Sequence, residues 1–182
     1  AATARDVLLI DADDQESSTD FTVLRNEKRS EGAGYTTIKL TGSGVRTETK
    51  RLREKYDDII IDAGGRDTTS QRAALSIADV LIVPFVPRSF DIWTLEKVAE
   101  LVNEMRQVNP ELKAYVFLNK ADPSGSDNED AADVLQESQE LLFLNTPIGS
   151  RKAFGKAAGS GLAVTELRPQ DPKATEEITA LY

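Results

Sequence analysis

Short apolar runs recur along the chain and predict the strands of a sheet. The central run, residues 59–61, is three isoleucines followed by Asp62-Ala63-Gly64-Gly65, which predicts a strand buried on both faces. Residues 6–13 repeat this pattern of an apolar core ended by acids. Further strands are predicted at 35–40, 79–84, 113–119 and 141–144.

Between these runs, apolar residues recur at helical spacing, as in Val45, Thr49, Leu52 and Tyr56. Strands that alternate with helices predict an α/β fold, a doubly wound and mostly parallel sheet with helices on both faces. Right-handed crossovers would place the strand ends at one edge. Helices are predicted at 45–56, at about 70–78 and at 172–182, and over part of 153–161. A further helix is predicted to begin at 13–18, and two more are predicted to end near residues 105 and 140.

Polar side chains follow several of these strands. Asp11 and Asp13 end the first, Asp62 ends the central one, and Asn119-Lys120 ends the strand at 113–119. Ligands bind at the carboxyl edge of such sheets. Crowded carboxylates repel one another unless a cation, usually Mg²⁺, lies among them. The structural alternative is that each Asp only ends a strand or caps the next helix.

Composition narrows the chemistry. The 182 residues contain no Cys and no His, which excludes thiolate and imidazole sites and leaves oxygen ligands for any metal. The net charge of -9 opposes nucleic-acid binding over the whole surface, although a local basic patch can still bind it. No apolar run approaches the roughly 20 residues that span a bilayer.

These residues resemble the ParA/MinD family of deviant Walker A ATPases. The resemblance covers nearly the whole chain and favours the partitioning, ParA-like branch. It is carried by Leu8 to Gln15, which resembles the family's D-x-D-P-Q signature, by Ile59 to Asp62, which resembles its Walker B strand, and by 78–84 with Pro87, 117–120 and 159–167.

The resemblance implies roles for single residues. Asp13 would orient the attacking water, Asp62 would hold Mg²⁺, and Asp11 would help to shape the metal site. The backbone N–H of Gly64 would face the γ-phosphate of ATP, and Asn119 would lie against the adenine. The implied function is a cytoplasmic ATPase for plasmid or chromosome partitioning, which forms a homodimer with ATP and is reset by hydrolysis with a centromere-binding partner protein.

Three features depart from the family pattern. Asp14 stands where the family has Pro, and Ala63-Gly64-Gly65 replaces the usual Pro-containing turn. No phosphate loop of the type G-x-x-x-x-G-K-[ST] occurs in residues 1–182, although that loop supplies the N–H cradle and the lysine. We therefore expect one ATPase domain that lacks its first strand, its phosphate loop and most of its first helix, and that binds nucleotide poorly as it stands.

A basic cluster interrupts the acidic sequence at Arg151, Lys152 and Lys156. Its functional interpretation is a surface for nonspecific DNA, with an affinity that falls as salt rises. Its structural alternative is a solvated helix face. The segment from Lys173 to Tyr182 has acids at its middle and a small apolar face, so it is a poor membrane anchor.

A second function class also matches the order of the acids. A phosphoacceptor receiver domain needs paired acids, a phosphorylated Asp, a hydroxyl and a Lys after successive strands. Asp13-Asp14, Asp62, Ser89 and Lys120 follow that order. The receiver interpretation does not account for the long segment after Lys120. A third interpretation is a non-catalytic family relative that binds a partner without turnover.

Overall fold

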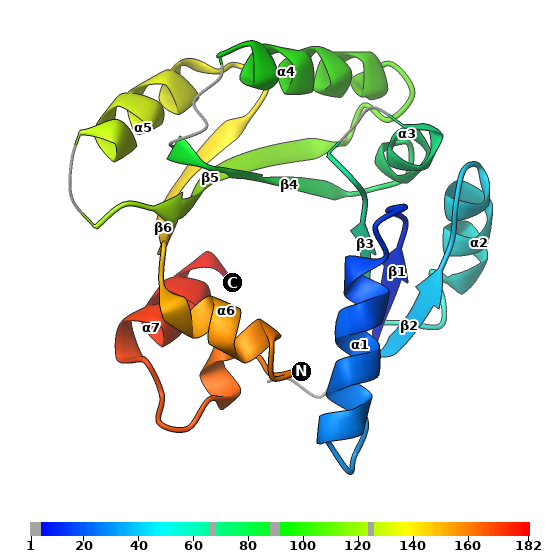
Figure 1. The fold of residues 1–182 in the computed structure, drawn as a ribbon. Helices are drawn as coiled ribbons and strands as arrows, with labels where there is room; N and C mark the ends of the chain where they lie inside the picture. Colours follow the sequence, from blue (N-terminus) through cyan, green and yellow to red (C-terminus); the bar gives the residue numbers. More distant parts are fainter. Residues whose placement is uncertain (1–4, 66–67, 88–91, 124–125) are drawn as a thin grey trace. The chain divides into compact units, whose positions relative to one another are not determined.

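The computed structural model describes residues 5–65, 68–87, 92–123 and 126–182, and in these ranges strands alternate with helices (Figure 1). The chain divides into two compact units, residues 1–78 and 79–182. The predicted parallel α/β class is confirmed, because every strand pair within the two units is parallel.

Unit 1 contains a three-stranded sheet in the order β2-β1-β3. Its strands are β1 (Val7–Asp11), β2 (Thr36–Lys39) and β3 (Asp58–Asp62), and its helices are α1 (Ser17–Lys28), α2 (Gly44–Leu52) and α3 (Thr69–Leu75). The helices α2 and α3 pack on one face of the sheet, where Val45 and Ala74 form a cluster with Ala12 and Ile61. Thr68 caps α3 by accepting a hydrogen bond from the Gln71 backbone N–H at 3.1 Å.

Unit 2 contains a second three-stranded sheet, in the order β4-β5-β6. Its elements are β4 (Val80–Phe85), α4 (Ile92–Arg106), β5 (Lys113–Ala121), α5 (Asp127–Glu137), β6 (Leu142–Gly149), α6 (Lys152–Ala158), the 3-10 turn η2 (Val164–Glu166) and α7 (Pro172–Leu181). The main core lies where α4 and α5 cover one face of the sheet (Figure 1).

The C-terminal part of unit 2 has its own small core. Ala157 of α6, Val164 of η2 and Ala174 of α7 pack together there. The N-terminus of α7 follows the sequence signals, because Asp171 accepts a hydrogen bond from the Ala174 backbone N–H at 3.0 Å and Pro172 occupies the first turn. The strand predicted at 141–144 is longer than expected and continues to Gly149.

The prediction that the apolar strands are buried on both faces is wrong in part. Burial alternates along β4: Leu81 and Val83 pack against the core, whereas Val80 and Ile82 are 47% and 53% exposed. Ile60 at the middle of β3 is likewise 55% exposed. Among the described residues, the helices of each unit thus bury one face of its sheet more fully than the other.

Candidate functional site

The acids of the first and central strands meet at one edge of the unit 1 sheet. Asp11 at the end of β1 is in register with Asp62 at the end of β3, and the Ala12 backbone N–H donates to the Asp62 carbonyl at 2.8 Å. The predicted adjacency of these two strand ends is therefore confirmed. Asp13 and Gly64 follow immediately in the two loops.

Asp11 is fully buried, and its carboxylate forms hydrogen bonds within the protein. Its Oδ2 accepts hydrogen bonds from the Thr19 backbone N–H at 2.8 Å and from the Thr19 hydroxyl at 2.7 Å. Its Oδ1 accepts a longer bond, 3.3 Å, from the Asp13 backbone N–H. A carboxylate at the first turn of a helix is favoured by the exposed N–H groups there. These bonds anchor the first turn of α1 to β1, and the predicted contribution of Asp11 to the shape of a metal site stays a prediction.

Asp62 has the opposite environment, because its side chain is exposed. The Ser18 hydroxyl, from the first turn of α1, donates to Asp62 Oδ2 at 2.5 Å. Within the described ranges, no hydrogen bond to Asp62 Oδ1 is found. One carboxylate oxygen is thus held and the other can still accept a ligand.

Asp13 and Gly64 lie against each other. A Cβ built on Gly64 would be 2.9 Å from Asp13 Oδ1, which is closer than real Cβ contacts. The same oxygen accepts a hydrogen bond from the Gln15 backbone N–H at 3.2 Å, a local turn that aims the carboxylate. Gly64 therefore leaves the space that the Asp13 carboxylate occupies.

The described residues contain no group of three or more acidic side chains arranged to hold a metal ion. A cage built by protein ligands alone is therefore not supported. Mg²⁺ in nucleotide sites is commonly held by one or two carboxylates together with phosphates and water. The exposed Asp62, with one oxygen available, fits that second mode.

Glu16 is a feature of this edge that sequence reasoning missed. It has a left-handed backbone (φ 56°), which is costly for a residue other than glycine, and its carboxylate forms an ion pair with Lys39. The hydrogen bond with Glu16 raises the pKa of Lys39 above its ordinary value. The Ser-rich stretch after Asp13 predicted only the start of a helix and gave no signal for the roles of Glu16, Ser18 or Thr19.

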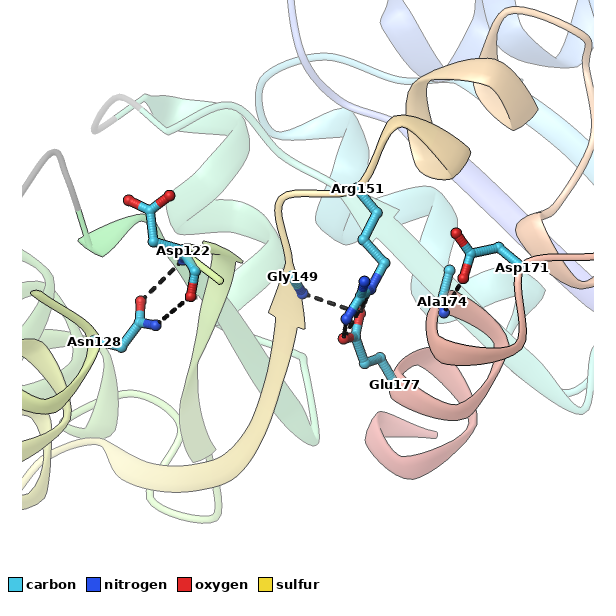
Figure 2. Close-up of polar contacts among 7 residues, drawn as sticks. All are labelled: Asp122, Asn128, Gly149, Arg151, Asp171, Ala174 and Glu177. Carbon is cyan, nitrogen blue, oxygen red and sulfur yellow. Dashed lines mark hydrogen bonds and ion pairs between the residues drawn. The ribbon is translucent and has the colours of Figure 1, made fainter. Parts of the chain in front are cut away.

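Asn119 belongs to unit 2, where an irregularity of the sheet positions it. The β5–β6 register shifts on both sides of Asn119, and the following Lys120 has a left-handed backbone (φ 54°). Figure 2 shows how the next loop is held: the Asn128 side chain accepts from the Asp122 backbone N–H at 3.1 Å and donates to the Asp122 carbonyl at 2.7 Å. Ser89, which the receiver interpretation needs, lies outside the described residues.

The three residues of the basic cluster in unit 2 have different surroundings. Arg151 donates to both carboxylate oxygens of Glu177 on α7, with bonds of 2.5–2.9 Å, and the Gly149 backbone N–H donates to Glu177 at 3.1 Å (Figure 2). This pairing lowers the pKa of Glu177 and raises that of Arg151. Lys152 and Lys156 are exposed, whereas Arg151 is engaged by Glu177, so these two lysines are the more accessible cations of the predicted DNA surface.

A concavity accompanies this basic surface. It has a volume of about 630 Å³, is open to solvent, and lies between α6 and the start of α7. Lys156 and Lys173 line it together with apolar groups that include Leu167 and Pro172.

None of the helices in the described part of the chain has the length and apolar character needed to cross a membrane.

Comparisons with known proteins agree with the motifs. A family model described as ATPase MipZ matches residues 37–112. The maintenance of carboxysome distribution protein A of Halothiobacillus neapolitanus is 24% identical over 133 residues, which are 72% of this chain and 61% of that protein. Protein IncC of Escherichia coli is 25% identical over 146 residues, 79% of this chain and 41% of that protein. The chain thus spans less than two thirds of either relative.

Solved structures share the fold. A McdA variant from Cyanothece in complex with ATP matches with a TM-score of 0.76 and 18% identity, over 99% of this chain and 86% of that chain. The cell division ATPase MinD of Pyrococcus furiosus matches with a TM-score of 0.65 and 18% identity, over 98% and 87%. The family match, the relatives and the residues at the strand ends together make this chain similar to ATPases of the ParA/MinD type.

Proposed function

We propose that this chain belongs to a ParA-like ATPase that partitions plasmid or chromosome DNA. The observation that carries the proposal is the pair of adjacent strand ends, which leaves one Asp62 oxygen available beside Asp13 and Gly64. ATP-dependent dimerisation and nonspecific DNA binding would form the active state, and hydrolysis would reset it. The cytoplasm is the proposed location, and a centromere-binding protein is the proposed partner.

Each residue of the edge has a distinct part in this proposal. Asp62 would hold Mg²⁺, which supplies charge neutralisation at the phosphates when it is bound. Asp13 would accept a hydrogen bond from the attacking water and orient it, because its carboxylate is aimed by the Gln15 turn. The Gly64 N–H would face the γ-phosphate. The reaction also requires a phosphate loop, which no stretch of residues 1–182 matches.

The names of the relatives support a partitioning role and leave the cargo open. One relative is named for the distribution of carboxysomes, and the structural match includes an ATP complex of McdA. Whatever the cargo, we propose that this protein binds DNA, because Lys152 and Lys156 offer exposed cations in an acidic protein.

Substitution of the two acids, Asp62 and Asp13, tests the proposal. We expect Asp62→Ala to abolish Mg²⁺-dependent ATP hydrolysis. Asp13→Ala should lower hydrolysis about 10²-fold or more while ATP binding persists, because water orientation acts on the chemical step. Steady-state phosphate release and fluorescent ATP binding measure the two effects. Wild-type turnover in Asp62→Ala would remove the metal role from Asp62.

The receiver alternative is separated by a phosphodonor. Under the ATPase proposal, acetyl phosphate with Mg²⁺ leaves Asp62 unmodified, as intact mass spectrometry would record. A stable acyl phosphate on Asp62 would instead support the receiver interpretation.

A further inference from the structure

Ser18 connects two elements that are far apart in the sequence. It is the second residue of α1, and Asp62 is the last residue of β3. The Ser18 hydroxyl donates to Asp62 Oδ2 at 2.5 Å, while Ser18 is half-buried and Asp62 is exposed. A short hydrogen bond from a half-buried donor to an exposed carboxylate fixes a group that water alone would leave free to turn.

We infer that Ser18 is a positioning residue for Asp62 in the proposed magnesium and nucleotide site. The terminal torsion of an Asp side chain is broad, so an unrestrained carboxylate presents its two oxygens in many directions. The hydrogen bond from Ser18 occupies Oδ2 of Asp62, so Oδ1 would be the oxygen that binds Mg²⁺ or its water. This inference rests on the proposed function, because it concerns how Asp62 performs that role.

The fold holds Ser18 in place from both sides. The next residue, Thr19, binds the buried Asp11 through its backbone N–H and its hydroxyl, which fixes the first turn of α1 to β1. One turn later, the Thr22 hydroxyl donates to the Ser18 carbonyl at 2.7 Å and also contacts the Tyr35 hydroxyl at 3.1 Å. The Ser18 side chain is thus carried by a backbone whose position is set by other contacts.

The neighbouring serine supplies a matched control. Ser17 begins α1 and is exposed, and no hydrogen bond of its side chain is found in the described part of the chain. Ser17→Ala and Ser18→Ala remove the same hydroxyl from adjacent positions of one helical turn. Alanine favours the helix at both positions, so a difference between the two variants reports the bond to Asp62.

The test measures Mn²⁺ binding to the full-length protein in the presence of ATP, by the loss of the free Mn²⁺ signal in electron paramagnetic resonance. Groups that orient a metal ligand typically change affinity by 10–100-fold, and for the half-buried Ser18 we expect Ser18→Ala to raise the Mn²⁺ Kd about tenfold. Ser17→Ala should leave it unchanged, and Ser18→Thr should restore it. ATP affinity measured in EDTA should be equal in all variants.

The outcomes separate this inference from the proposed function. An Mn²⁺ Kd in Ser18→Ala within about twofold of wild type, together with a clear loss in Asp62→Asn, would overturn the role of Ser18 alone. No loss in Asp62→Asn would overturn the metal role of Asp62 itself. Thermal unfolding confirms that each variant is folded. Ser18→Cys, which keeps a side chain of the same shape but with a slightly larger and weaker donor, replaces Ser18→Ala if that variant is unstable and should show the same defect.

Discussion

At the scale of single residues, the contact between Gly64 and Asp13 explains why glycine follows the central strand. The reason is space, because the backbone at Gly64 is not left-handed and the obstacle to a side chain is the Asp13 carboxylate. An added methyl group would displace a flexible side-chain end, which gives way at small cost. The consequence is expected in catalysis more than in stability.

Gly64→Ala therefore should reduce ATP hydrolysis about 10²-fold, because a displacement of roughly 1 Å at a catalytic group has that effect. The Gly64 N–H is retained, so the loss would come from Asp13. The expected change in the free energy of unfolding is below about 1 kcal/mol, since only a side-chain torsion of the half-buried Asp13 is strained. Gly65→Ala is the control, because a Cβ on Gly65 meets nothing within 4 Å. Equal turnover in the two variants would contradict the explanation.

Sequence reasoning placed the strand-end acids but not the groups that hold them. Asp11, Asp13 and Asp62 were identifiable because they lie at the ends of apolar runs, and the parallel pairing of β1 with β3 confirms that Asp11 and Asp62 share an edge. The role of Ser18 was not predicted, because its hydrogen-bond partner Asp62 is 44 residues away in the sequence. The ion pair of Arg151 was missed for the same reason: its partner Glu177 lies 26 residues further along the chain.

At the scale of elements, one carboxylate fastens α7 to β6 and α6. Glu177 of α7 accepts from Gly149 at the end of β6 and from Arg151 at the start of α6. The Arg151 and Glu177 side chains are only 30% and 20% exposed, so solvent screens this ion pair less than it screens a surface pair.

Glu177→Gln is expected to lower the free energy of unfolding by about 1–2 kcal/mol, because hydrogen bonds to a charged partner are lost or weakened. The pKa of Glu177 is lowered in the folded state, chiefly by Arg151, so the folded protein binds this proton less readily than the unfolded chain does. The contribution of Glu177 is therefore complete above pH about 4.3 and is lost as the pH falls through the lowered value.

Urea unfolding of wild type and Glu177→Gln between pH 3 and pH 7 measures this effect. The difference between the two proteins should be largest near neutrality and shrink in acid. Glu176→Gln removes an exposed charge from the adjacent position of α7 and should show little difference at any pH. A Glu177 effect that is constant with pH would mean that packing, and not the ion pair, fastens α7.

The elements themselves were predicted with uneven success, for physical reasons. Long apolar runs identified β1, β3 and β4, since a strand in a parallel sheet must avoid polar groups at its core. The second half of β6, from Asn145 to Gly149, is mixed in polarity and was missed, because its pairing with β5 depends on a register shift near Asn119. Such irregularities are set by long-range pairing and leave no local sequence pattern.

At the scale of the whole molecule, charge decides how a protein with a net charge of -9 can approach DNA. The bulk of the surface repels phosphate, so any binding must come from a few local cations and must weaken steeply with salt. Arg151 is engaged in an ion pair with Glu177, which makes it a less accessible cation than its two neighbours on α6. Lys152 and Lys156 on α6 are both exposed, and Lys156 also lines the concavity of unit 2.

Replacing Lys152 and Lys156 by Ala should therefore weaken retention of the ATP-bound, full-length protein on random-sequence DNA. If both lysines contact phosphate in one protomer, the slope of log affinity against log salt should fall in magnitude by up to about 1.8 per protomer, since each neutralised phosphate contributes about 0.9. Fluorescence anisotropy over a range of KCl concentrations measures the slope. Lys97→Ala with Lys113→Ala is the control, because these exposed lysines of the same unit give an equal change in net charge away from α6. A control pair with the same slope change would show that net charge, and not the α6 surface, governs DNA binding. The variant Arg151→Ala should act mainly on stability, because it removes the ion-pair partner of Glu177.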